Sequence, residues 1–285
     1  MSKKEFLAEL QNRLSGLPRD DDSERLIAQE ETAMRTLSIG NSFSEDACAY
    51  LHLGAESAGI EWETVNLVIG GCSLAYHAEN LREGCANYML EINGQHTGRM
   101  ISLPEALSAG TYDVITLQQA SRFSGKRETY YPFIGELAEA CRAAQPSAKL
   151  MLQQTWAYET DWNYEWFADY GWDQKRMYSL LCDAYREAAD SIGAGLIPVG
   201  DVVQYFREQV PGFDYPSGMS LCRDGFHLSI PVGRYLAALV WFETLSGQDC
   251  RAVSFRPDGM EEERQRALVE AVHAFLAGGR PGRGD

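Results

Sequence analysis

The sequence predicts an α/β protein in which helices cover both faces of a largely parallel sheet. The first observation is a set of five short apolar segments without strict polar–apolar alternation, a pattern typical of parallel strands buried on both faces. These segments span residues 36–40, 64–69, 113–117, 149–153 and 195–199. The second observation is that helical patterns lie between the segments, near residues 45–58, 131–145, 174–192 and 231–246. Such alternation indicates an open α/β sheet, whose ligands bind at the carboxyl ends of the strands.

Two local signals predict further elements. Asn93-Gly94 lies between two extended runs within residues 88–102, which predicts a β-hairpin. Ser102 and Glu105 have the spacing of a capping box, so we expect a helix to begin there.

The chain is expected to have three regions. Residues 1–33 are predicted to form a helical extension, because Ser2 and Glu5 match a capping box and apolar residues follow at helical spacing. This extension could pack on the main domain or dock a partner protein. The main domain is expected over residues 34–278, and the Gly/Arg-rich residues 279–285 are expected to be a flexible tail.

The composition limits the classes of partner. The chain has 285 residues, a formal net charge of −16 and a pI of about 4.8, without a basic stripe. We therefore expect neither nucleic acid nor an anionic membrane surface as a partner. Seven scattered cysteines are typical of reduced thiols, and the first residues lack the apolar core of a signal peptide, so we expect a cytoplasmic protein.

Two distant segments supply the groups that acyl transfer needs. Ser42 follows the first predicted strand, ahead of a helix expected to begin near Glu45, where the positive helix terminus favours a developing oxyanion. Ser44 is expected to cap that helix, which leaves Ser42 free. Asp224 and His227 supply a carboxylate and a base three positions apart. The alternative is that Asp224 only caps a turn and His227 only packs.

The residues around these groups resemble the conserved blocks of SGNH (GDSL-type) hydrolases. G-N-S-F-S at residues 40–44 is similar to the opening block, and D-G-F-H-L-S at residues 224–229 is similar to the closing block. Gly70-Gly71 matches the block whose glycine N–H joins the oxyanion hole. The resemblance covers about residues 35–247 and is nearest to an uncharacterised branch. It implies a three-layer α/β/α sandwich with a flavodoxin-like parallel sheet of about five strands.

The resemblance also implies roles for individual residues. Ser42 corresponds to the nucleophile, His227 to the base and Asp224 to the residue that orients the imidazole. The oxyanion would be bound by the N–H groups of Ser42 and of Gly70 or Gly71.

Two positions depart from the family pattern. The family ends its third strand with an asparagine that completes the oxyanion hole, whereas this chain has Gln118-Gln119, so we expect Gln118, or else Gln119, to donate there. Asn41 replaces the family's aspartate, a structural position, and is counted among the residues expected beside the substrate.

An aromatic segment follows the fourth predicted strand, on the side where the site should open. We expect Trp156, Tyr158, Trp162 and Trp166 to bind substrate, since flat rings with polar edges suit stacking on sugars. Trp162 and Trp166, four positions apart, are expected to share one exposed helix face. The alternative is a lid that its aromatic residues anchor to the core.

These patterns together predict a serine esterase that removes an acyl group, such as acetyl, from a carbohydrate-like small molecule. No cofactor is expected, and no metal, because the remaining histidines lack partners at ligand spacing; they are His52, His77, His96 and His273. Two alternatives stay open: a non-catalytic glycan-binding protein on the same fold, and a partner-docking protein that uses its N-terminal helices. The pattern predicts no oligomeric state.

Overall fold

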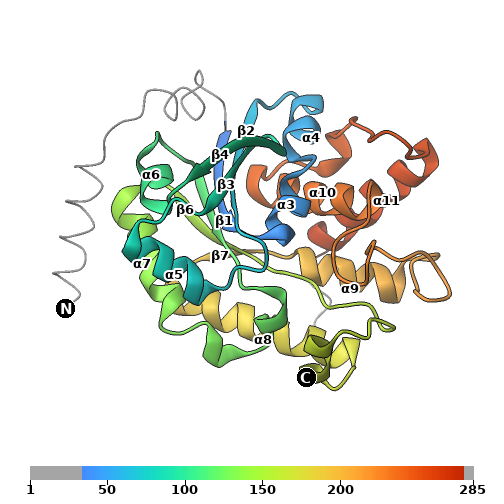
Figure 1. The fold of residues 1–285 in the computed structure, drawn as a ribbon. Helices are drawn as coiled ribbons and strands as arrows, with labels where there is room; N and C mark the ends of the chain where they lie inside the picture. The colour runs from blue at the N-terminus through green and yellow to red at the C-terminus, as the bar shows by residue number, and fades with distance from the viewer. Residues whose placement is uncertain (1–33, 279–285) are drawn as a thin grey trace.

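The computed structural model describes residues 34–278 as a seven-stranded sheet between two layers of helices (Figure 1). The predictions for residues 1–33 and 279–285 lie outside these described residues. The strands are β1 Met34–Gly40, β2 Trp62–Val68, β3 Tyr88–Ile92, β4 Gln95–Ile101, β5 Val114–Leu117, β6 Lys149–Gln153 and β7 Gly195–Ile197. Their order across the sheet is β4-β3-β2-β1-β5-β6-β7.

The five segments predicted as parallel strands form the parallel part of the sheet. β1 pairs with β2 and β5, β5 with β6, and β6 with β7, all parallel. The α/β class and the three-layer arrangement are thus confirmed, but the predicted number of about five strands is wrong. The hairpin β3–β4 adds two antiparallel strands at the edge of β2.

The turn of the hairpin makes further contacts with β2, in addition to the pairing of β3 with β2. Asn93 and Gly94 both have positive φ, as a tight two-residue turn requires. Asn93 Oδ1 accepts a hydrogen bond from Thr64 N at 2.9 Å, and Asn93 N donates to Thr64 O at 2.9 Å, which fixes the turn against β2. A side chain at Gly94 would meet the carbonyl of Ala49, so the turn also packs closely against the backbone at this residue.

Nine helices lie within residues 34–278, with four short 3₁₀ turns. They are α3 Ser42–Cys48, α4 Leu51–Ser57, α5 Leu74–Glu83, α6 Leu103–Ser108, α7 Phe133–Ala144, α8 Gln174–Ile192, α9 Val199–Gln209, α10 Val232–Ser246 and α11 Glu262–Ala277, and the 3₁₀ turns are η1 Ser121–Phe123, η2 Arg127–Thr129, η3 Glu165–Tyr170 and η4 Cys250–Ala252. Contacts group α3, α4, α9, α10 and α11 on one face of the sheet and α5 to α8 on the other (Figure 1). No helix within the described range is long and apolar enough to cross a membrane.

The predicted helices are present, with one correction at the first. The patterns at 131–145, 174–192 and 231–246 correspond to α7, α8 and α10, and the capping box of Ser102 and Glu105 begins α6. The pattern at 45–58 is two helices, α3 and α4, and α3 begins at Ser42 rather than near Glu45. Its cap is Asn41 rather than Ser44, because the Asn41 side chain accepts from Phe43 N.

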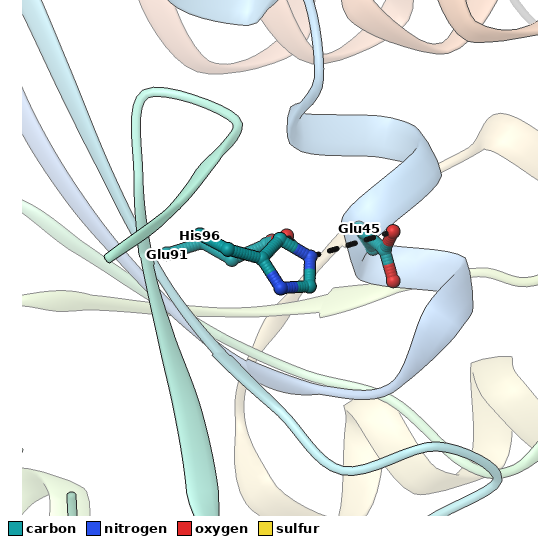
Figure 2. A group of neighbouring side chains, drawn as sticks. All are labelled: Glu45, Glu91 and His96. Carbon is teal, nitrogen blue, oxygen red and sulfur yellow. Dashed lines mark ion pairs between the residues drawn. The ribbon is translucent and has the colours of Figure 1, made fainter. Parts of the chain in front are cut away.

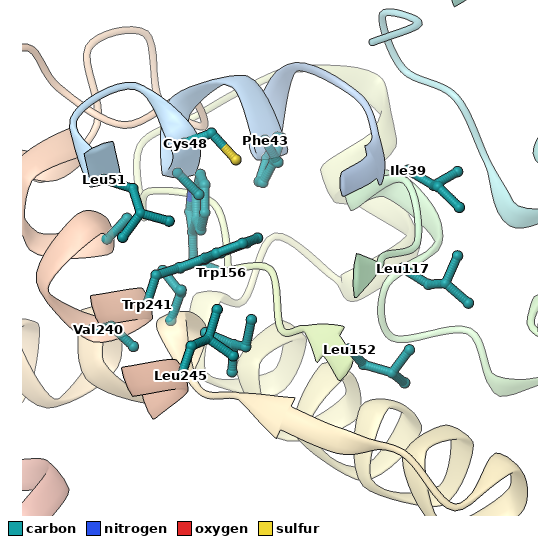
Figure 3. Packing of buried hydrophobic residues seen from close by; sticks show 14 of the residues in the cluster. Ile39, Phe43, Cys48, Leu51, Leu117, Leu152, Trp156, Val240, Trp241 and Leu245 are labelled. Carbon is teal, nitrogen blue, oxygen red and sulfur yellow. The ribbon is translucent and has the colours of Figure 1, made fainter. Parts of the chain in front are cut away.

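The apolar core connects the first helix with the aromatic segment. Phe43 of α3 stacks on Trp156 with ring centroids 4.3 Å apart, and both side chains are buried (Figure 3). Trp156 follows β6, and Phe43 follows β1, so this contact joins segments at the carboxyl ends of two parallel strands. The same edge of the sheet carries the loops after β2 and β5, and it is the edge where ligands bind in such folds.

Candidate active site

Ser42, His227 and Asp224 form one hydrogen-bonded chain. Ser42 is the first residue of α3, and its Oγ lies 2.9 Å from His227 Nε2. His227 Nδ1 lies 2.7 Å from Asp224 Oδ2. The three residues expected from the sequence are therefore brought together, although they come from opposite ends of the domain.

Asp224 also organises the backbone of its own loop. Its Oδ1 accepts hydrogen bonds from the backbone N–H of His227 at 2.8 Å and of Phe226 at 3.3 Å. Capping the turn and orienting the imidazole are thus done by the two oxygens of one carboxylate. Partial burial raises the pKa of Asp224, but the hydrogen bonds from the His227 side chain and backbone outweigh it and hold the pKa below its usual value.

This ionised carboxylate determines the imidazole tautomer. A proton on Nδ1 of His227 is stabilised by Asp224, which leaves Nε2 free to accept from the Ser42 hydroxyl. The arrangement is able to deprotonate Ser42 during attack on an electrophilic centre.

A buried carboxylate, Asp46, connects α3, the helix that begins at Ser42, to the loop of residues 223–228 that carries His227 (the histidine loop). It lies one turn after Ser42 in α3 and is fully buried. It accepts hydrogen bonds from Leu228 N at 2.8 Å, Arg223 Nη1 at 2.9 Å and Arg234 Nε at 2.8 Å. The sequence analysis missed this residue; its signal was an acidic residue four positions after the serine together with an arginine directly before Asp224.

The aromatic segment holds the other side of the histidine loop. Trp156 Nε1 donates to Phe226 O at 2.6 Å, and Glu159 N donates to Gly225 O at 2.8 Å. Gly225 has φ +90, and a Cβ there would collide with the indole of Trp162. A glycine is required at this position, because both the conformation and the close ring contact exclude a side chain.

The predicted substrate-binding role of Trp156 and Tyr158 is contradicted by their burial. Both side chains are fully buried, and the Tyr158 hydroxyl pairs with Ser121 Oγ at 3.0 Å. They belong to the core beneath the site, as the anchoring alternative predicts.

Trp162 and Trp166 do not share a helix face, since Trp162 precedes η3 and Trp166 lies within it. Both are partly buried: Trp162 stacks on Tyr164 at 5.3 Å, and Trp166 lies under the Arg122 guanidinium at 5.1 Å. Two rings of the aromatic segment are exposed: Tyr164, with 48% of its surface accessible, and Trp172, with 49%. Tyr164 is the one connected to Phe226 through Trp162, so it provides the exposed ring on this side of His227.

Three backbone N–H groups near Ser42 have no acceptor within residues 34–278. Ser42 N is one. Asn41 accepts hydrogen bonds from the N–H groups of the three residues after Ser42 in the first turn of α3, but not from Ser42 N. Gly70 N and Gly71 N are the others, and both glycines are exposed. Ile69 N donates to Gly40 O at 3.4 Å, which holds this glycine turn beside the start of α3.

Asn41 connects neighbouring loops through hydrogen bonds and does not occupy the substrate-contact position expected from the sequence. It is buried, its Nδ2 donates to Cys72 O at 3.0 Å, and its Oδ1 accepts from Phe43 N and from Gln118 Nε2. All of its side-chain atoms thus serve the junction of the first, second and third strand loops. These contacts fit the expectation that Asn41 has a structural role, and they do not fit the expectation that it lies beside the substrate.

The amides of the two glutamines are engaged to different extents. Gln118 is buried, its Nε2 donates to Asn41 Oδ1 at 2.6 Å and has a second N–H, and its role at an oxyanion stays a prediction. Gln119 Oε1 accepts from Leu74 N and Ala120 N, and its Nε2 donates to Thr129. The alternative of Gln119 as the donor is contradicted, because its amide is used to hold α5 and the η2 turn.

Other reactive groups near the site are inert. Burial lowers the pKa of His77 to about 3, and its Nδ1 lies 2.8 Å from the Tyr88 hydroxyl. Burial raises the pKa of the Cys72 and Cys222 thiols, so neither is a ready nucleophile.

Solved structures share this fold. A protein from Slackia heliotrinireducens assigned to the SGNH hydrolases has 26% identity and a TM-score of 0.51, over 75% of this chain and 99% of that chain. An acetyl xylan esterase, AlAXEase, has 14% identity and a TM-score of 0.50, over 74% of this chain and 100% of that chain. The SGNH-type fold expected from the sequence is confirmed by these likenesses. No curated protein matches the chain.

A third comparison is more specific. The crystal structure of a DUF4886 family protein from Bacteroides uniformis has 35% identity and a TM-score of 0.79, over 86% of this chain and 95% of that chain. The model of the domain of unknown function DUF4886 matches residues 35–275. The chain therefore belongs to the DUF4886 family, an uncharacterised branch of proteins with the SGNH hydrolase fold.

Proposed function

We propose that the protein is a serine ester hydrolase that acts through an acyl-enzyme. The observation that carries the proposal is the hydrogen-bonded chain Ser42–His227–Asp224, with distances of 2.9 and 2.7 Å. The N–H groups of Ser42, Gly70 and Gly71, which have no acceptor among residues 34–278, support it, because acyl transfer needs donors for an oxyanion beside the nucleophile.

The proposed reaction uses the triad twice. His227 Nε2 takes the Ser42 proton as Oγ bonds to the acyl carbon, and the carbonyl electrons move to the oxygen. The tetrahedral intermediate expels the alcohol, which receives the proton from Nε2. Water then loses a proton to His227 Nε2 as it bonds to the acyl carbon, and the bond from this carbon to Ser42 Oγ breaks. Oγ takes the proton back from Nε2, which releases the acid and restores Ser42. These steps require no metal and no cofactor.

The proposed substrate is a small ester of the acetylated-sugar type. Its support is the exposed Tyr164 ring stacked on Trp162, whose indole lies 5.0 Å from the Phe226 ring directly before His227. The same fold occurs in an acetyl xylan esterase. The cytoplasmic location, and the expected lack of nucleic-acid and membrane partners, stay predictions.

A fluorophosphonate probe tests the proposal directly. The activated Oγ of Ser42 should displace fluoride and form a covalent adduct that peptide mapping assigns to this residue. Ser42→Ala and His227→Ala should abolish labelling, whereas Ser147→Ala, an exposed serine before β6 at the opposite edge of the sheet, should not affect it. A non-catalytic glycan-binding protein would give no adduct while a known serine hydrolase reacts alongside.

A further inference from the structure

A second polar cluster lies on the nucleophile helix, away from the triad. Glu45 of α3, Glu91 of β3 and His96 of β4 face one another (Figure 2). His96 Nε2 is 2.8 Å from Glu91 Oε1 and 3.8 Å from Glu45 Oε1. The His96 side chain is 54% exposed, so the cluster is open to solvent on that side. Sequence spacing gave no sign of it, because the hairpin and α3 are distant in the chain.

Glu91 is the unusual member of this cluster. Its side chain is 1% exposed, and its Oε2 accepts from Asn66 Nδ2 at 2.7 Å. Among residues 34–278 no hydrogen-bond donor serves its buried Oε1, although His96 Nε2 lies 2.8 Å away at ion-pair distance. Burial raises the pKa of Glu91, and Glu45 raises it further, whereas Asn66, His96 and Arg234 lower it. A buried carboxylate oxygen without a donor is stabilised by a proton or a cation.

We propose that Glu45, Glu91 and His96 bind a divalent transition-metal ion of the Zn²⁺ type. Zn²⁺ lies about 2.0–2.2 Å from nitrogen and oxygen ligands, so two ligand atoms of one ion are at most about 4.4 Å apart. The distances of 2.8 and 3.8 Å from His96 to the two carboxylates meet this limit, and the ligand atoms of all three residues lie within 4.8 Å of one another. One imidazole with two carboxylates is a donor set that Zn²⁺ accepts, whereas Mg²⁺ and Ca²⁺ prefer oxygen ligands alone.

A similar cluster elsewhere gives an internal comparison. Glu243, Asp249 and Cys250 also have ligand atoms within reach of one another. There, however, His273 Nδ1 lies 3.0 Å from Glu243, and Arg251 forms an ion pair with Asp249 at 2.5 Å. Burial raises the pKa of the Cys250 thiol, which keeps it protonated. The first cluster also has a neighbouring arginine, since Arg234 Nη2 lies 4.0 Å from Glu45 Oε1. The second cluster differs because both oxygens of Glu243 have hydrogen-bond partners, His273 Nδ1 and Cys250 N, so it serves as the control.

The bound ion would join the hairpin to the helix that carries the nucleophile. Glu45 is in the first turn of α3, and Asn66 connects Glu91 to Ser44 Oγ through a hydrogen bond of 2.8 Å. The ion would therefore fix β3–β4 against α3 and stabilise the native protein. This inference does not depend on the proposed esterase activity.

Calorimetric titration of the chelator-dialysed protein with Zn²⁺ tests the site. We expect one equivalent to bind with a Kd in the micromolar range or below. Glu91→Gln and His96→Gln should each weaken binding at least tenfold, while His273→Gln should leave it unchanged. His96→Gln changes an exposed side chain, so this variant should fold even if Glu91→Gln does not.

Two further readouts separate a built site from general attraction to an acidic protein. The wild-type Tm should rise by about 5–10 °C at a Zn²⁺ concentration one hundred times the Kd, and His96→Gln should lose this rise. Mg²⁺ at the same concentration should produce no such shift. Zn²⁺ binding that is non-stoichiometric, that is retained in His96→Gln, or that is lost only in His273→Gln would overturn the proposal.

Discussion

Replacing Asp46 with asparagine should slow the chemistry at Ser42 by more than its effect on stability explains. The carboxylate is the meeting point of three donors: Leu228 N, Arg223 Nη1 and Arg234 Nε. Asparagine keeps the size of the side chain but replaces one accepting oxygen with an N–H donor, which would face a donor. The connection between α3 and the histidine loop would be broken at its centre.

The magnitude follows from the burial of the partners. Removing one member of a fully buried ion pair costs about 3–5 kcal/mol. The side chains of Arg223 and Arg234 are 34% and 19% exposed and can regain water, so we expect a loss of about 2–4 kcal/mol. For a domain of this size the Tm should fall by about 5–12 °C. A displacement of His227 of about 1 Å would slow the reaction by roughly 100-fold.

A matched control separates positioning from stability. Glu63 is a buried carboxylate that pairs with Arg35 at 2.5 Å, and both residues lie near the amino ends of β1 and β2, away from the site. Glu63→Gln and Asp46→Asn should lower the Tm to a similar extent. At a temperature well below both transitions, only Asp46→Asn should slow fluorophosphonate labelling, by about 30- to 100-fold. Equal labelling rates in the two variants would refute the positioning role of Asp46.

Three further predictions concern the oxyanion donor, a buried histidine and the exposed ring. Gln118→Ala should lower turnover of an aryl acetate by roughly 100- to 1,000-fold, whereas Gln119→Ala should lower the Tm without that loss; equal turnover in both variants would contradict the assignment. Burial lowers the pKa of His77 to about 3, so the contribution of the neutral imidazole to stability is complete above pH 6.5 and declines below it, as the unfolded chain binds the proton. The fall in Tm from pH 7.5 to 5.5 should therefore be steeper in wild type than in His77→Gln. Equal slopes in the two proteins would exclude His77 as a cause of the pH dependence. Tyr164→Ala should raise the KM for an acetylated sugar severalfold and leave that for phenyl acetate unchanged, while an unchanged sugar KM would end the idea of a stacking surface.

The architecture could be predicted where a local pattern determines it. Five apolar runs gave the parallel strands, and Asn93-Gly94 gave the hairpin. The pairing of that hairpin with β2 could not be predicted, because the ladder between β2 and β3, and the contacts of Asn93 with Thr64 beside it, join segments that are distant in the chain. The start of α3 was misplaced for a related reason: Asn41 and Ser44 are both good capping residues, and only the tertiary contacts of Ser44 with Asn66 decide between them.

The candidate site was predictable to a similar degree. Ser42, Asp224 and His227 carry local motifs, whereas Asp46 and the Glu45–Glu91–His96 cluster depend on segments that only the fold brings together. The exposure of the aromatic segment could not be predicted from the sequence either, because the same pattern of tryptophans occurs when the rings pack in the core and when they bind a ligand.

The residues directly before and after His227 are both held by hydrogen bonds to their backbone. On one side Asp46 accepts from Leu228 N, and on the other Trp156 Nε1 donates to Phe226 O. These two bonds flank His227, so the loop is fixed through its backbone at the residues directly before and after the base. An imidazole fixed in this way lies 2.9 Å from Ser42 Oγ, which is the contact that the proposed proton transfer needs, so the proposed mechanism depends on the backbone contacts of Phe226 and Leu228 as well as on Asp224.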